Sequence, residues 1–214
     1  MTSILRRRLV LGSFIGLATG IARAAPEAQF QSALETFLRA SDGDTAAIEP
    51  AADAFATLLG RDPANPVLMA YAGAATAMRA STTLLPWKKM SHAEEGLAML
   101  DKALALLTPA HDAPIQRGVP GSLEVRFIAA TTFVAVPGFM NRGARGAKLF
   151  AEVQASPLFA GAPLGFRGSV WMRAAKQAAK EQHVDDARRL YALVIEQKAP
   201  QAERAAVALK GLGS

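Results

Sequence analysis

The sequence predicts an all-α protein of stacked antiparallel helix pairs, with about nine helices after an N-terminal leader. Three observations predict this fold class. Apolar residues recur at i, i+3, i+4 and i+7 along most of the chain, which is the period of a helix buried on one face. Proline and glycine interrupt this pattern at short intervals, and no segment is convincing as a strand. A characteristic spacing between large and small residues also occurs more than once along the chain, as in a repeat protein.

The first 24 residues predict a secretory signal peptide. Arg6–Arg8 form a positive region, and Leu9–Ala22 supply an apolar stretch of about 14 residues, short of the roughly 20 that span a bilayer as a helix. Small residues at Ala22 and Ala24 predict cleavage after Ala24 and a single mature domain over residues 25–214. The arginine cluster fits either the general secretory or the twin-arginine route, so the expected compartment is the periplasm.

Composition limits the function classes. The chain has 24 basic and 18 acidic residues, but four of the basic residues lie in the leader, which leaves 20 basic against 18 acidic ones. That near balance argues against a nucleic-acid partner. The chain contains no cysteine, which excludes disulfides and thiolate metal sites. Packing must therefore stabilise the fold.

The elements of the first half follow from periodicity and helix-end signals. Residues 30–38 and 48–59 each carry one apolar stripe. Asn65-Pro66 is typical of a helix start, and that helix is expected to run to about Ser81. Ser91–Glu94 matches a capping box, in which serine and glutamate side chains satisfy each other's backbone donors, and predicts the start of the next helix.

The second half contains one ambiguous segment. Residues 123–136 are apolar enough for a strand, but a helix is preferred because an isolated strand would leave its backbone unpaired. Further helices are expected at about 144–153, 167–180, 185–198 and 201–212.

An internal spacing resembles the tetratricopeptide repeat. In the helix pair predicted at the C-terminal end, a large residue, a small residue, an aromatic residue and a proline after the second helix occupy the family's positions. A similar order occurs where one predicted helix pair meets the next, between residues 48 and 73. These residues are Trp171, Ala187, Tyr191 and Pro200, and Ala51, Phe55, Pro63 and Gly73. The resemblance implies stacked helix pairs in a superhelical solenoid, and a concave surface that binds a protein or peptide without chemistry of its own.

The middle unit departs from this pattern. Gly96 takes the small position of the second helix, but it follows Gly73 by 23 residues where the repeat has 12. The excess of about 11 residues includes Leu84, Leu85 and Met90 together with Trp87, Lys88 and Lys89. Two interpretations are open: Trp87 folds back over the edge of the core, or these residues form an exposed patch that docks a partner or the membrane surface.

Two further groups are candidate binding residues. Arg126, Asn141 and Arg142 either line a groove for an acidic or carboxylate group, or tie helix ends to nearby carbonyls. If the protein instead carries a lipid or another apolar ligand between helix pairs, we expect Phe127, Phe133 and Phe139 to line the cavity.

Motifs for catalysis are missing. The sequence has no nucleophile elbow, phosphate loop or dinucleotide fingerprint. His92 with Glu95, and His183 with Asp185 and Asp186, are weak metal candidates, so no metal or cofactor is expected. The expected function is an exported binding or scaffolding protein rather than an enzyme, with the apolar carrier as the alternative.

Overall fold

A computed structural model describes residues 18–213 of the chain. Over these residues the chain forms nine α-helices in adjacent packed pairs, joined by turns and short 3-10 segments, and none of it forms a strand. The predicted all-α fold of paired helices is confirmed. The helices are α1 (Ala18–Ser41), α2 (Ile48–Arg61), α3 (Pro66–Met78), α4 (Pro86–Ala105), α5 (Gly121–Ala135), α6 (Gly143–Ala155), α7 (Leu164–Lys180), α8 (Val184–Glu196) and α9 (Ala202–Gly211).

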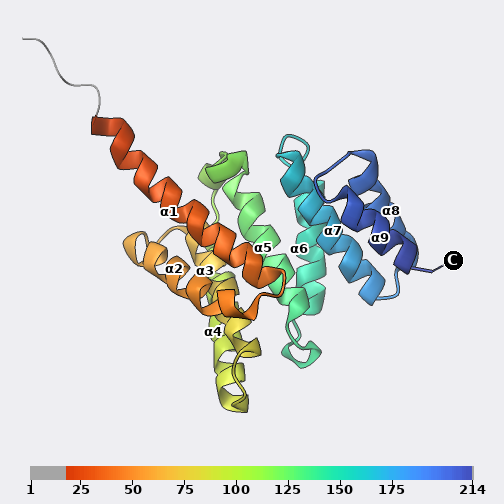
Figure 1. The fold of residues 1–214 in the computed structure, drawn as a ribbon, viewed down its shortest axis with the longest axis horizontal. Coiled ribbons are helices and arrows are strands. Elements are labelled where there is room, and N and C mark those ends of the chain that lie inside the picture. The colour runs from red at the N-terminus through yellow and green to blue at the C-terminus, as the bar shows by residue number, and fades with distance from the viewer. Residues whose placement is uncertain (1–17, 214) are drawn as a thin grey trace, which may run out of the picture.

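The helices follow one another across the molecule in chain order, from α1 at one end to α8 and α9 at the other (Figure 1). Most of the predicted leader lies outside the described residues, and the predicted cleavage site Ala24 falls within α1. Among the described residues, no helix combines the length and apolar character needed to cross a bilayer.

Aromatic residues build the core of the N-terminal half. Phe30 and Phe37 of α1, Phe55 of α2 and Tyr71 of α3 are all buried. Phe55 and Tyr71 pack against each other, and each packs against both phenylalanines of α1. Tyr71 stacks on Phe55 with ring centroids 4.7 Å apart and meets Phe37 edge-on at 5.0 Å. Both arrangements are favourable for aromatic pairs. The first three helices therefore share one core, to which the apolar stripe predicted at residues 30–38 contributes.

Two glycines set the packing of α3 against α4. A Cβ atom on Gly96 would lie 2.4 Å from the carbonyl oxygen of Gly73 and 2.6 Å from the backbone nitrogen of Ala77. Only glycine permits so close an approach of two helix backbones. Gly73 and Gly96 are thus partners across a helix pair, and the residues between them extend the hairpin beyond that contact.

The predicted start of α4 is wrong. The helix begins at Pro86, so Ser91 and Glu94 lie inside it and do not form a capping box. Proline suits the first position of a helix because its φ angle is already helical and it has no amide hydrogen to satisfy. The first two turns of α4 precede Ala93, its first buried residue. They project past the neighbouring helices (Figure 1).

The ambiguous segment 123–136 is helical, as preferred, and forms most of α5. Near the C-terminus, Trp171 of α7 is buried, as are Ala187 and Tyr191 of α8. Ala187 allows α8 to pack closely on α7.

Candidate functional site

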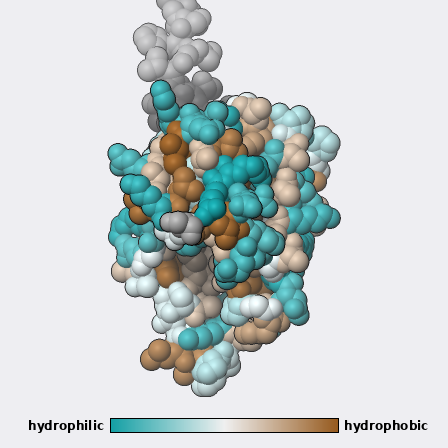
Figure 2. Space-filling model, turned by 90° about the vertical axis from the view of Figure 1, so that its right-hand side faces the viewer, coloured by the Kyte–Doolittle hydropathy of each residue, from teal (hydrophilic) through white to brown (hydrophobic). Residues whose placement is uncertain are grey.

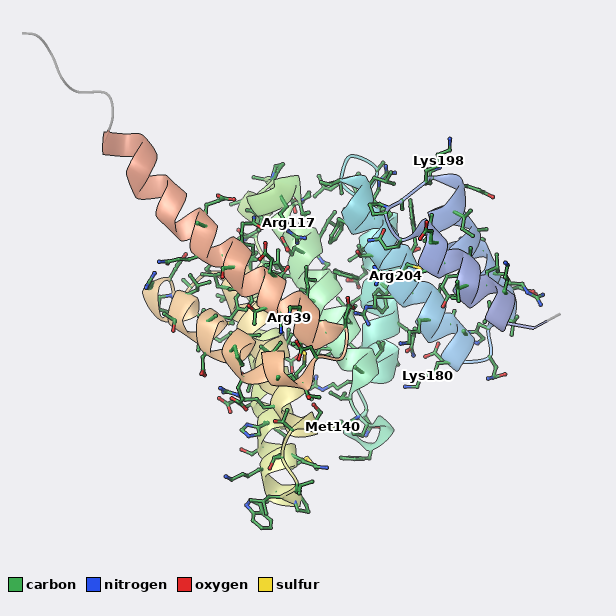
Figure 3. The ribbon with its side chains drawn as sticks, in the orientation of Figure 1. Arg39, Arg117, Met140, Lys180, Lys198 and Arg204 are labelled. Atoms are coloured by element: carbon green, nitrogen blue, oxygen red, sulfur yellow. The ribbon has the colours of Figure 1, made fainter. Side chains whose placement is uncertain are left out.

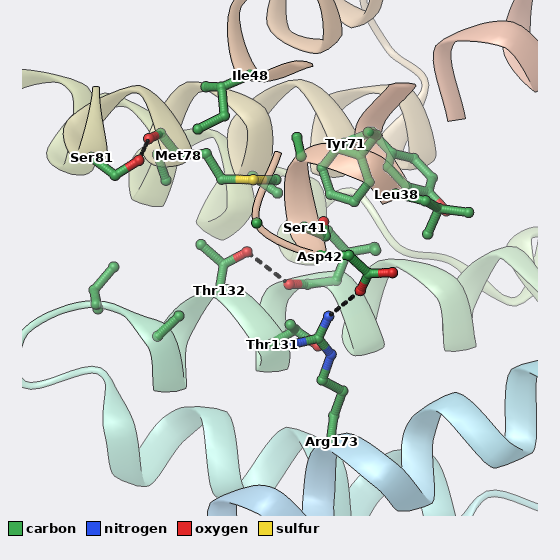
Figure 4. Close-up of a pocket in the computed structure, with 18 of the residues that line it drawn as sticks. Leu38, Ser41, Asp42, Ile48, Tyr71, Met78, Ser81, Thr131, Thr132 and Arg173 are labelled. Atoms are coloured by element: carbon green, nitrogen blue, oxygen red, sulfur yellow. Dashed lines mark hydrogen bonds and ion pairs between the residues drawn. The ribbon is translucent and has the colours of Figure 1, made fainter. Parts of the chain in front are cut away.

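A groove of about 1220 Å³ runs through the middle of the molecule. Its walls come mainly from α1, α3, α5 and α7, the odd-numbered helices, with additions from the start of α4 and the region of α9. The even-numbered helices α2, α6 and α8 contribute no wall residue beyond Ile48 at the start of α2. Figure 4 shows residues of α1 and α3 on one side of this space, with α5 and Arg173 of α7 on the other.

The groove is largely apolar, and small side chains explain why there is space. Alanines on α3, α4 and α5 and in the 3-10 turn after α3 leave room where larger residues would have filled the gap between helices. These alanines are Ala74, Ala77, Ala80, Ala93 and Ala135. Larger apolar residues complete the lining, among them Phe37, Ile48, Met78, Phe127, Phe139, Phe166 and Met172. An apolar concave surface of this kind is the usual form of a binding site.

Positive charge dominates the polar part of the lining. The described residues that line the groove include five cations and one acid, Asp42. The cations are Lys89, Arg117, Arg173, Lys176 and Arg204. Asp42 lies 3.9 Å from both Arg173 and Arg204, so two cations share one carboxylate. The groove therefore favours a ligand that is both apolar and negatively charged.

Two polar atoms in the lining lack a hydrogen-bond partner. The hydroxyl oxygen of Thr131 and the side-chain carbonyl oxygen of Gln201 are both buried and unpaired. The amide nitrogen of Gln201 is occupied, because it donates to Gly165 O at 3.0 Å and to Ser169 Oγ at 2.9 Å. Buried polar groups are normally paired, so these two atoms are available to a bound ligand.

A charge cluster around the buried Glu124 adjoins the groove, since its members Tyr71 and Arg117 belong to the groove lining. Glu124 of α5 is only 1% exposed and accepts hydrogen bonds from the Tyr71 hydroxyl and, at 2.5 Å, from the Arg117 guanidinium. Arg117 also lies 3.3 Å from the Tyr71 hydroxyl and sits beside the start of α5 (Figure 3). Burial, followed by the negative charge of Glu124, raises the pKa of Tyr71 well above its usual value. Tyr71 therefore stays protonated and acts as a donor.

Comparisons with known proteins found no match. Protein-family models, curated proteins and solved structures were each searched, and none matches this chain. The geometry of the groove and of the surface around it therefore carries the interpretation of the site.

The exposure of Trp87 rules out one of its two interpretations. We define the hairpin tip as Leu84, Leu85 and Met90 with Trp87, Lys88 and Lys89. Leu84 is 92% exposed and Trp87 is 67% exposed, so the idea that Trp87 covers the edge of the core is wrong. A tryptophan in the first turn of a projecting helix has no core within reach. Of the tip residues, Lys89 and Met90 also line the groove.

The three residues expected to share one groove do not share it. Arg126 donates a hydrogen bond to Ser122 O of its own helix at 3.1 Å, so it binds a nearby backbone carbonyl, which was the second of its two interpretations. Asn141 is exposed and adopts a left-handed backbone with φ of 54° at the end of a turn. Arg142 pairs with Asp101 of α4 at 3.0 Å and lines only a second, smaller cavity. Its role is to fasten α6 to α4.

The aromatic lining expected for a carrier is partly wrong. Phe127 and Phe139 do line the groove. Phe133 is fully buried, and the guanidinium groups of Arg142 and Arg145 lie 5.5 and 5.1 Å from its ring centroid. As for the weak metal candidates, no three metal-ligating side chains gather anywhere in the described part of the chain.

Sequence reasoning missed the cations of α7 and α9 and the cluster around Glu124. Arg173, Lys176 and Arg204 look like ordinary solvated residues in sequence, because their common face exists only after α1, α7 and α9 have packed. Glu124 did carry a signal: it is a lone carboxylate in an apolar helical segment. Such a residue needs a buried partner, but Tyr71 is 53 positions away.

Proposed function

We propose that this protein is an exported binding or scaffolding module, similar in organisation to tetratricopeptide-repeat proteins, that holds a segment of a partner protein in its central groove. The observation that carries the proposal is the groove itself: an apolar surface along the odd-numbered helices with five cations against one acid. A segment with apolar side chains and acidic residues complements both properties. The function requires no bond-making step.

The groove is also long enough to hold an extended peptide. Its lining extends from Leu38 in α1 to Arg204 in α9, so it spans nearly all the stacked pairs. A stack of helix pairs offers this kind of extended concave surface because each pair is slightly rotated on the one before it. The unpaired oxygens of Thr131 and Gln201 provide fixed points for hydrogen bonds to a peptide backbone or side chain.

Site-specific cross-linking tests the proposal. A photoreactive amino acid is placed at Met172, which lines the groove, or at Ala151, which is exposed on α6 outside it. Irradiation in the native host is expected to join a defined protein segment to position 172 and not to position 151. Equal yields at both positions would exclude the groove as the binding site.

A matched pair of charge reversals tests the contribution of the cations. Lys176 and Lys180 are exposed residues one turn apart on α7, but only Lys176 lines the groove. Lys176→Glu is expected to weaken the captured interaction roughly tenfold, whereas Lys180→Glu leaves it nearly unchanged. The dissociation constant of the cross-linked segment, measured as a synthetic peptide, is the readout.

The apolar lining favours one second candidate, a carrier of a lipid or another apolar ligand. Phe127, Phe139 and Phe166 line a space larger than the few hundred cubic ångströms of many small-molecule sites. Native mass spectrometry of protein purified from its host separates the two functions. A retained small molecule supports the carrier, and a bare polypeptide mass together with a cross-linked peptide supports the scaffold.

A further inference from the structure

The hairpin tip is an exposed apolar surface that adjoins the groove: Lys89 and Met90 belong to the groove lining, whereas the other tip residues lie outside it. Leu84 and Trp87 are the most exposed apolar residues of the tip. Phe139, in the turn between α5 and α6, is 68% exposed and lines the same small cavity as Met90. Figure 3 shows the neighbouring Met140 beside α4. Figure 2 shows apolar side chains at the lower end of the molecule, where the hairpin lies in Figure 1.

The charged residues of the tip itself are both cations, and the acids Glu94 and Asp101 lie further along α4 in the small cavity that Met90 and Phe139 also line. No aspartate or glutamate occurs between Asp62 and Glu94. Lys88 and Lys89 are exposed, and neither belongs to any ion pair found among the described residues. The first turn of α4 contains no acid, and Leu85 at its N-cap offers no side-chain cap, so the positive end of the helix dipole adds to the two lysines.

Shape argues against a protein as the occupant. A standard protein interface uses about 20 to 30 residues on each side, whereas this tip offers four apolar side chains on a narrow projection, with Phe139 beside them. A bilayer surface accepts such a projection because lipids rearrange around it. Tryptophan is favoured at the level of the lipid headgroups, and lysines are attracted to anionic headgroups.

We propose that the hairpin tip docks the protein on the surface of an anionic phospholipid bilayer. Leu84 and Trp87 enter the interfacial region, Phe139 adds a second apolar contact, and Lys88 and Lys89 pair with headgroup phosphates. Lys89 and Phe139 also line the groove, so the docked tip adjoins it. Leu84, Trp87 and Lys88 lie outside the groove lining, so their contact with lipid does not require a ligand in the groove.

Tryptophan fluorescence tests the docking directly. The chain has two tryptophans, and Trp171 is only 8% exposed, so a lipid-induced change reports Trp87. The protein is titrated with vesicles of phosphatidylcholine alone or mixed with phosphatidylglycerol. We expect a blue shift and protection from an aqueous quencher with the anionic vesicles. Because a retained leader would bind vesicles by itself, this local signal is preferred to co-sedimentation.

Matched variants locate the contact. Leu84→Ser is expected to weaken vesicle binding about tenfold, the effect of withdrawing one leucine side chain from an apolar environment. Val207→Ser is its control, because Val207 is 73% exposed on α9 at the other end of the molecule. Neither side chain is packed in the core, so both variants should keep the wild-type circular dichroism.

A second pair of variants tests the charge. Lys88→Gln with Lys89→Gln should weaken binding about 30-fold, since each lysine near an anionic surface contributes about 1 kcal/mol and about 1.4 kcal/mol is tenfold. Lys180→Gln with Lys210→Gln, two exposed lysines outside the tip, should have little effect.

Three results would overturn the proposal. The first is an unchanged Trp87 spectrum with anionic vesicles. The second is equal binding by Leu84→Ser and Val207→Ser. The third is a blue shift without lipid that grows with protein concentration and is lost in Leu84→Ser, which would assign the tip to a second copy of this chain.

Discussion

At the scale of single residues, the contact between Tyr71 and Glu124 is the most consequential. It joins α3 to α5 inside the core, and the Arg117 guanidinium compensates the charge of the buried carboxylate. Removing one partner of such a buried pair leaves the others unsatisfied, which costs more than the hydrogen bond itself contributes. The cluster thus joins two of the helices that line the groove.

We expect Tyr71→Phe to lower the free energy of unfolding by about 1–3 kcal/mol, because Glu124 loses one donor. The change also alters the pH dependence. The pKa of Tyr71 is raised in the folded state, so its contribution to stability is complete below the unfolded pKa of about 10. That contribution is lost as the pH rises from there towards the folded pKa, by up to about 1.4 kcal/mol per pH unit.

Urea unfolding at neutral and alkaline pH measures this effect. The alkaline loss of stability should be smaller in Tyr71→Phe than in the wild type. Tyr191→Phe is the control, since the pKa of Tyr191 is also raised by burial but no carboxylate adds to that shift. Equal alkaline slopes in Tyr71→Phe and wild type would contradict the assignment.

At the scale of elements, glycine decides how closely α3 and α4 pack. We expect Gly96→Ala to destabilise the protein by about 1–3 kcal/mol or more, because the new Cβ would meet the backbone of α3. The matched control is Gly60→Ala near the end of α2, where a Cβ would meet nothing within 4 Å. Gly60→Ala should stabilise by about 0.5–1 kcal/mol through the better helix propensity of alanine. Thermal unfolding of both variants tests the pair, and a neutral Gly96→Ala would contradict the close contact.

Helix existence could be predicted from the sequence, whereas some helix boundaries could not. The stripe from Phe30 to Leu38 and the start at Pro66 are local patterns, and the structure has both. Ser91 and Glu94 also form a local pattern, but Pro86 begins the helix five residues earlier. A capping pattern has no effect once the chain before it is already helical.

At the scale of the whole molecule, stability should decrease towards the C-terminal end of the stack. α3 buries ten residues, whereas Ala205 is the one described residue that α9 buries. A terminal helix contacts neighbours on one side only, so it opens at low cost. We expect amide hydrogen exchange to be much faster in α9 than in α3 at neutral pH. Equal protection in both helices would contradict a sequential stack.

The sequence by itself determined the fold class and the unusual length of the middle hairpin, because both depend on spacing along the chain. It also marked Trp87 and its lysines as unusual, although exposure could only be settled by the structure. Tertiary structure alone decided the site. Asp42, Arg117, Arg173 and Arg204 meet around one groove only when distant helices pack, and the partners of Arg142 and Glu124 likewise lie on other elements. Periodicity specifies which face of a helix is buried, but not which helix covers it.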